Sequence, residues 1–97
     1  MMVTDEPGYY EKGKFGIRIE NCLLVVKSQY PGYLCFENIT LTPYDRNLID
    51  NNLLSHADRE YINKYHERVL AEVLPVLKEM KVESYVEEWL VQATKPL

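Results

Sequence analysis

A carboxylate followed by a rigid turn lies close to the start of the chain, in the run Thr4-Asp5-Glu6-Pro7-Gly8-Tyr9-Tyr10. A proline disfavours the helical conformation of the residue before it, so we expect Glu6 to be held extended at the end of a strand. A carboxylate fixed in this way is suited to bind a metal ion or to act as a general base. The alternative is an acidic pair that enters a surface loop, and composition alone favours that alternative.

A second charged pair lies in the run from Gly16 to Asn21. Arg18 and Glu20 alternate with apolar residues, so they point to the same face of a strand, about 6.5–7 Å apart. On a solvated face such a pair has no functional meaning. Next to the fully apolar run 22–26, it suggests charges that point into a buried polar site, where they must be paired or must coordinate a metal. Both interpretations stay open from these residues.

Other kinds of chemistry have no support in the sequence. It contains no glycine-rich phosphate loop, and no serine or cysteine with an evident base. His56 and His66 are ten residues apart, which is not the spacing of two metal ligands on one helix face. We interpret each as a surface histidine.

Composition and charge narrow the class of protein. A chain of 97 residues is at most one domain. The formal charge of -4 and the lack of a basic cluster argue against nucleic acid or an anionic membrane as a partner. The longest apolar run is too short to span a bilayer, and the first residues do not form a signal peptide. Cys22 and Cys35 are interpreted as reduced apolar side chains rather than a disulfide, which predicts a cytoplasmic protein.

The first half of the chain is predicted to form strands. The strongest candidate runs from Phe15 to Lys27, and its apolar part, 22–26, indicates a central strand buried on both faces. A second long strand is predicted from Tyr33 to Pro43, with a bulge near Glu37-Asn38 where the apolar parity changes. Residues 1–4 are expected to end a third strand.

The second half is predicted to form two helices. Ser55, followed three residues later by Asp58, is typical of a helix start. An apolar stripe at helical spacing follows and consists of Tyr61, Ile62, Tyr65, Val69, Val73, Leu77 and Met80. Pro75 lies opposite this stripe and predicts a kink or a break.

A second helix is expected from Glu83 to Ala93. Its inward face is predicted to consist of Val82, Val86, Trp89, Leu90 and Ala93. Because strands and helices are segregated along the chain, the sequence indicates an α+β fold.

Taken in order, these motifs resemble one family over essentially the whole chain. The runs 4–10 and 15–21 are similar to the end of the catalytic domain of Xaa-Pro aminopeptidases, metallopeptidases of the creatinase/methionine-aminopeptidase "pita-bread" fold. The two glutamates, fourteen residues apart, match the spacing in the eukaryotic cytosolic enzymes. Residues 34–43 resemble the last catalytic-domain strand. Residues 63–66, 88–90 and 94–97 resemble the C-terminal helical extension of the long eukaryotic-type enzymes.

The resemblance implies a role for four residues. Glu6 matches the fourth metal ligand of the family, and Glu20 matches the fifth, which bridges two metal ions. These ions are manganese in the first instance, with zinc or cobalt as alternatives, and oxygen ligands suit manganese. Arg18 and Tyr10 match residues of the catalytic site: an arginine that braces the ligand carboxylates, and a tyrosine near the site. In the family, two such metals activate a water and polarise the scissile carbonyl of a peptide with proline at its second position.

The resemblance also implies that this chain does not act alone. The family's two aspartate ligands, its histidine ligand and its catalytic histidines lie upstream of the Glu-Pro-Gly motif and have no counterpart here. We therefore expect a C-terminal portion whose residues 1–46 end the catalytic domain and whose residues 47–97 form the helical extension. Alone, it is expected to be inactive and to bind metal weakly at most. The alternative from another class is a non-catalytic module that forms a homodimer, as the extension does in the eukaryotic branch.

Overall fold

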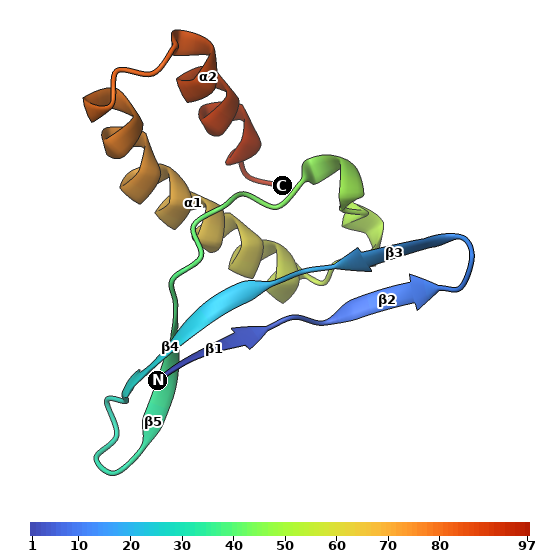
Figure 1. The fold of residues 1–97 in the computed structure, drawn as a ribbon, viewed down its shortest axis with the longest axis vertical. Helices are drawn as coiled ribbons and strands as arrows, with labels where there is room; N and C mark the ends of the chain where they lie inside the picture. Colours follow the sequence, from blue (N-terminus) through green and yellow to red (C-terminus); the bar gives the residue numbers. More distant parts are fainter. The chain divides into compact units, whose positions relative to one another are not determined.

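The computed structural model describes all residues, 1–97 (Figure 1). The chain forms two compact units, residues 1–40 and 41–97. All the strands lie in the first unit and all the helices lie in the second, which confirms the predicted α+β segregation. No helix is both long and apolar enough to cross a membrane.

A three-stranded antiparallel sheet forms the body of the first unit. Its strands, in spatial order, are β1 (Met2–Asp5), β4 (Asn21–Lys27) and β5 (Leu34–Asn38). The central place of β4 agrees with its uninterrupted apolar run. The prediction that this strand is buried on both faces was wrong for this unit, because the residues of β4 are half-buried at most.

A separate two-stranded hairpin consists of β2 (Gly8–Glu11) and β3 (Phe15–Arg18). The single strand predicted from Phe15 to Lys27 is thus divided, with a break at residues 19–20. Pro7 lies opposite this break and has no N–H to donate, so the ladder is interrupted there. One backbone hydrogen bond remains there, donated by the N–H of Ile19 to the carbonyl of Pro7 at 3.1 Å.

The end of β5 differs from the prediction. The register between β4 and β5 is regular from Leu34 to Asn38, so the predicted bulge was wrong. Instead, the N–H of Thr40 donates to Oδ1 of Asn38 at 3.1 Å, and the hydroxyl of Thr40 accepts from the N–H of Cys22 at 2.8 Å. A side-chain turn therefore ends the strand, and it accounts for the change in apolar parity.

Helix α1 (His56–Glu79) begins as the sequence predicts. The hydroxyl of Ser55 accepts from the N–H of Asp58, and the N–H of Ser55 donates to the Asp58 carboxylate, both at 3.0 Å. These bonds lower the pKa of Asp58. The helix continues through Pro75, so no break occurs there. Pro75 is exposed, and water can therefore hydrate the carbonyl group that loses its partner.

Helix α2 (Ser84–Ala93) packs on α1, and the core of the second unit lies between them. Its buried apolar members are Tyr65, Val69 and Leu90. The inward position predicted for Trp89 was wrong, because this side chain is 58% exposed. The rest of the predicted face is retained, because Leu90 is fully buried and Val82, Val86 and Ala93 are half-buried.

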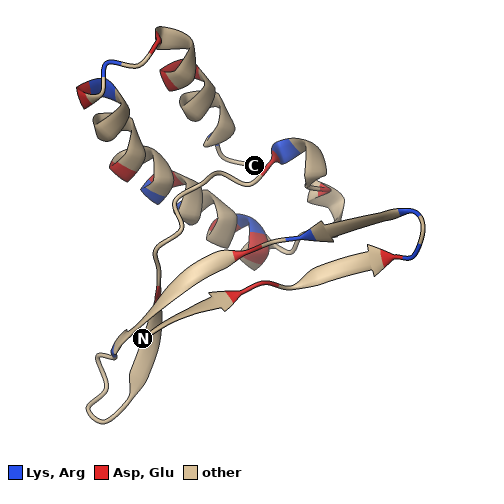
Figure 2. Ribbon diagram, in the orientation of Figure 1, with Lys and Arg blue, Asp and Glu red and all other residues tan.

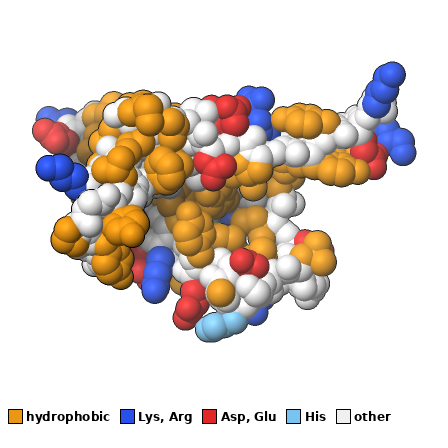
Figure 3. Space-filling view, turned by 90° about the horizontal axis from the view of Figure 1, so that it is seen from below, with side chains coloured by type: hydrophobic (Ala, Val, Ile, Leu, Met, Phe, Trp, Pro, Cys, Tyr) orange, Lys and Arg blue, Asp and Glu red, His pale blue; other side chains and the backbone are white.

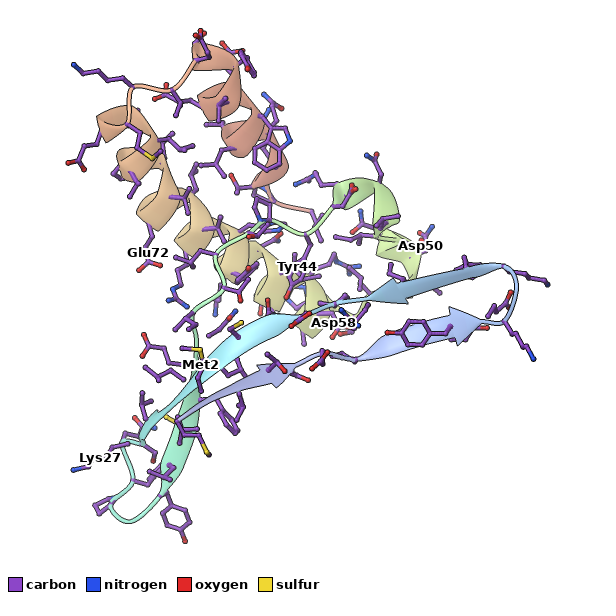
Figure 4. All side chains as sticks on the ribbon, viewed as in Figure 1. Met2, Lys27, Tyr44, Asp50, Asp58 and Glu72 are labelled. Carbon is purple, nitrogen blue, oxygen red and sulfur yellow. The ribbon has the colours of Figure 1, made fainter.

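Two short 3-10 helices, Arg46–Leu48 and Asn51–Leu53, precede α1. Upstream of them, residues 42–44 lie along α1, where Figure 4 labels Tyr44. The hydroxyl of Tyr65 donates to the carbonyl of Thr42 at 2.7 Å and accepts from its N–H at 3.1 Å. Nε2 of His66 accepts from the N–H of Tyr44 at 3.1 Å. His66 is fully buried, so its interpretation as a surface histidine was wrong.

Candidate metal centre

The candidate site lies where the β2–β3 hairpin joins the three-stranded sheet. Glu6 follows β1, Arg18 is the last residue of β3, and Glu20 lies in the break before β4. Figure 2 shows blue at the end of β3 close to red on the segments that follow β3 and β1. The interruption caused by Pro7 therefore brings together the two acidic motifs of the sequence.

Arg18 bridges the two candidate ligands. Its Nε lies 3.8 Å from Oε2 of Glu6, and its Nη2 lies 3.5 Å from Oε2 of Glu20. The three side chains are 42–52% exposed, so each ion pair by itself stabilises the fold little. Their significance is geometric, because one guanidinium lies within ion-pair distance of both carboxylates.

Thr4 contacts the other oxygen of Glu6. Its hydroxyl donates to Oε1 at 2.8 Å, while Oε2 faces Arg18. The two oxygens of Glu6 therefore have different partners, and the carboxylate has a defined rotation. Thr4 belongs to the motif around Glu6 in the sequence, but nothing in the sequence predicts its hydrogen bond to Glu6.

Tyr10 completes the group. The guanidinium of Arg18 is hydrogen-bonded to Tyr10, and this bond is the main reason why the pKa of Arg18 is raised, ahead of the charges of Glu20 and Glu6. Tyr9 takes no part, because its hydroxyl donates to Glu11 and its ring packs against Phe15 with centroids 5.9 Å apart. The structure thus brings the four predicted site residues together: Glu6, Tyr10, Arg18 and Glu20.

The chain's own side chains do not form a complete metal site. No group of three or more His, Cys, Asp or Glu side chains lies close enough together to hold an ion. Glu6 and Glu20 fit the part of an oxygen-rich site that two carboxylates supply. Both histidines lie in the second unit: His56 is exposed beside Glu60, with Nε2 3.3 Å from its Oε1, and His66 contacts Tyr44.

Two glycines near the site have a role that was missed. The ring of Tyr10 occupies the space that a Cβ atom would need at Gly8 and at Gly16. The sequence could have indicated this role, because it has a glycine in each strand of the hairpin. Such a glycine marks a close approach of another group to the backbone.

Comparison with known proteins identifies the family. The profile of the C-terminal region of peptidase M24 matches residues 32–97. Xaa-Pro aminopeptidase 2 of Homo sapiens is 48% identical over 101 residues, which is 100% of this chain and 15% of the human protein. A probable Xaa-Pro aminopeptidase P of Coprinopsis cinerea is 41% identical, over 100% of this chain and 16% of its own length. The chain therefore spans about a sixth of these relatives.

A solved structure has the same fold. The X-prolyl aminopeptidase of Caenorhabditis elegans, a cytosolic enzyme with a di-nuclear active site, superposes with a TM-score of 0.85 at 37% identity. The match covers 99% of this chain and 16% of the worm protein. This likeness confirms the predicted correspondence to the C-terminal part of a pita-bread aminopeptidase. The chain belongs to the family of the C-terminal region of peptidase M24.

Proposed function

We propose that these residues form the C-terminal part of a two-metal Xaa-Pro aminopeptidase. In this proposal Glu6 and Glu20 are metal ligands, and Glu20 is the bridging one. The substrates are peptides with proline at the second position, and the enzyme removes the residue before that proline. Residues 1–46 end the catalytic domain and residues 47–97 form the helical extension. The location is the cytoplasm, as for the worm relative.

One observation carries the proposal: the guanidinium of Arg18 forms ion pairs with both candidate ligands. The two ligands are fourteen residues apart in sequence and meet where the hairpin joins the sheet. A bridging carboxylate has to be fixed in direction, because it sets the separation of the two ions. Arg18 orients Glu6 and Glu20, and Thr4 fixes the rotation of Glu6. When bound, the metals would activate a water and polarise the scissile carbonyl. We propose manganese as the metal, with zinc or cobalt as alternatives.

The remaining ligands have to come from outside these 97 residues, so we propose that the chain alone is inactive. The test is a chimera in which residues 1–97 replace the matching part of the worm enzyme. We expect this chimera, loaded with manganese, to hydrolyse a peptide with proline at its second position. Glu6→Gln and Glu20→Gln should each abolish hydrolysis, because a ligand is lost. Arg18→Ala should reduce it about 10–100-fold, as for residues that orient ligands.

The matched control is Glu37→Gln, which removes an exposed carboxylate from β5 of the same unit. It should leave the activity unchanged. If the chimera folds and binds manganese, yet Glu20→Gln remains as active as the starting chimera, Glu20 is not a ligand and the proposal fails.

A second candidate function is a non-catalytic interaction module that forms a homodimer. Tyr85 and Trp89 favour it, because they lie four residues apart on α2 and are 68% and 58% exposed. Aromatic side chains of this kind are typical anchors of protein interfaces. Light scattering across micromolar concentrations should detect a dimer that the double substitution Tyr85→Ala/Trp89→Ala abolishes and Tyr30→Ala leaves intact. A monomer at every concentration would exclude this function for the chain alone.

A further inference from the structure

The geometry points to Gly8 and Gly16 as positioning residues that seat the ring of Tyr10 so that its hydroxyl reaches Arg18. The inference concerns two residues with no side chains to contribute, one in each strand of the β2–β3 hairpin. The effect on a metal centre rests on the proposed function. The placement of Tyr10 beside Arg18 rests on the contacts alone.

The ring of Tyr10 lies across the hairpin and fills the space above both glycines. A Cβ atom on Gly8 would lie 2.6 Å from Oη and 2.8 Å from Cζ of Tyr10. A Cβ atom on Gly16 would lie 2.6 Å from Cδ1 and 3.2 Å from Cε1. Non-bonded carbon atoms pack at about 3.5–4.0 Å, so neither position admits a side chain while the ring is there.

The register of the hairpin explains why these two positions are involved. Tyr10 is paired with Gly16, and Gly8 is paired with Arg18. The ring therefore starts above Gly16, passes toward Gly8 and ends with its hydroxyl beside Arg18, the cross-strand partner of Gly8. Cross-strand neighbours of this kind lie about 4.5–5.5 Å apart, within reach of an aromatic side chain.

The two glycines are not there for their backbone freedom. Positive φ angles at glycine occur in this chain at Gly13 and Gly32 only. Gly8 and Gly16 have strand conformations that alanine also adopts, so an alanine there strains the ring of Tyr10 rather than the backbone. Tyr10 is 65% exposed, so solvent can take up its ring, and the substitution should displace the ring from Arg18 without unfolding the hairpin.

The consequence for the site follows from the contacts of Arg18. Its guanidinium bonds to Tyr10 and faces Glu6 and Glu20. When the ring of Tyr10 is displaced, Arg18 loses its hydrogen bond to Tyr10. The orientation of Arg18 toward the two glutamates is then no longer fixed. Gly8 and Gly16 thus act on the candidate ligands through Tyr10 and Arg18 in turn.

The test is NMR spectroscopy of the 97-residue chain. In the wild type, the Hα protons of Gly8 and Gly16 should be shifted upfield by the ring of Tyr10, and Nε–H of Arg18 should have a distinct signal. Gly16→Ala should abolish the upfield shift at Gly8, and Gly8→Ala should abolish it at Gly16. Both should move the Arg18 signal in the same direction as Tyr10→Phe. Tyr10→Phe itself should keep both upfield shifts, because the ring stays.

Gly13→Asn is the matched control. Gly13 lies in the turn of the same hairpin, nothing lies within 4 Å of its Cβ position, and asparagine tolerates its φ of +73°. It should leave the signals of Gly8, Gly16 and Arg18 in place. In a Tyr10→Ala background, Gly16→Ala should not move the Arg18 signal further, since the glycine acts through the ring.

Two results would overturn the inference: glycine Hα protons without upfield shifts in the wild type, or an equal effect of Gly16→Ala on Arg18 with and without Tyr10. In the active chimera, Gly16→Ala should lower kcat with KM unchanged, whereas Gly13→Asn should not. A chimera without activity would contradict the proposed function, while the NMR comparison would still decide the seating of Tyr10.

Discussion

Nε2 of His66 accepts a hydrogen bond from the backbone N–H of Tyr44 at 3.1 Å, inside the second unit. An acceptor at Nε2 requires the neutral imidazole with its proton on Nδ1. The side chain is fully buried, and Nδ1 has no hydrogen-bond partner. The folded unit therefore favours the uncharged form of His66.

The stability of the second unit should consequently fall when the solution is acidified through the range of His66. Burial, and then the positive charge of Arg46, lower the pKa of His66 from its ordinary 6.5. Below pH 6.5 the unfolded chain binds a proton that the folded chain does not, so unfolding becomes easier as pH falls toward the folded pKa. Urea denaturation followed by helical circular dichroism at pH 7.5 and pH 5 measures this loss.

His66→Phe should abolish the pH dependence in this window, although the variant is less stable at pH 7.5 because the N–H of Tyr44 loses its acceptor. The control is His56→Gln, since His56 is exposed and its substitution should retain the wild-type dependence. The lowered pKa of Asp58 acts in a different window, because its contribution is lost only as pH falls below about 3.8. Equal slopes for wild type and His66→Phe between pH 7.5 and 5 would refute the assignment.

The hydroxyl of Tyr65 is predicted to hold residues 42–44 on α1. Tyr65→Phe removes the partner of both the carbonyl and the N–H of Thr42. Leaving partly buried backbone groups unpaired should lower the free energy of unfolding by about 1–3 kcal/mol. Tyr61→Phe, at a 63% exposed position one turn earlier, is the control and should change it by less than about 0.5 kcal/mol. Urea denaturation of the three proteins measures the difference, and equal stabilities would contradict the role of Tyr65.

Leu90 is predicted to be the main contribution of α2 to the core. It is 1% exposed and belongs to the cluster with Tyr65 and Val69. Leu90→Ala should cost about 2–5 kcal/mol, because it removes buried methyl groups and leaves a cavity. Leu53→Ala, at an 82% exposed position, should be nearly neutral. Thermal unfolding compares them, and a similar small loss in both variants would mean that α2 does not share a core with α1.

Manganese should bind weakly to this chain alone. Two carboxylates already paired with one arginine give few oxygen ligands, so we expect a Kd on the order of 1 mM or weaker by calorimetry. Glu6→Gln and Glu20→Gln should remove even this binding, and Glu37→Gln should not. Tight binding that depends on both glutamates would show instead that two chains, or other ligands, complete a site.

Local chemistry explains the parts of the protein that the sequence determined. Ser55 and Asp58 start α1, since the capping contacts span three residues of the chain. The apolar run 22–26 indicated the central strand, and β4 does lie between β1 and β5, although its residues are half-buried at most in this unit. The motifs around Glu6 and Glu20 were sufficient to indicate the family, because their order and spacing are properties of the sequence.

The tertiary structure decided what depends on partners distant in sequence. The break between β3 and β4 follows from Pro7 on the opposite strand, twelve residues before Ile19. The burial of His66 depends on residues 42–44, and the exposure of Trp89 depends on which face of α2 meets α1. The position of the Tyr10 ring requires the strand register that pairs Gly16 with Tyr10 and Gly8 with Arg18. Periodicity names the apolar residues of an element, but only packing against another element selects which of them become buried.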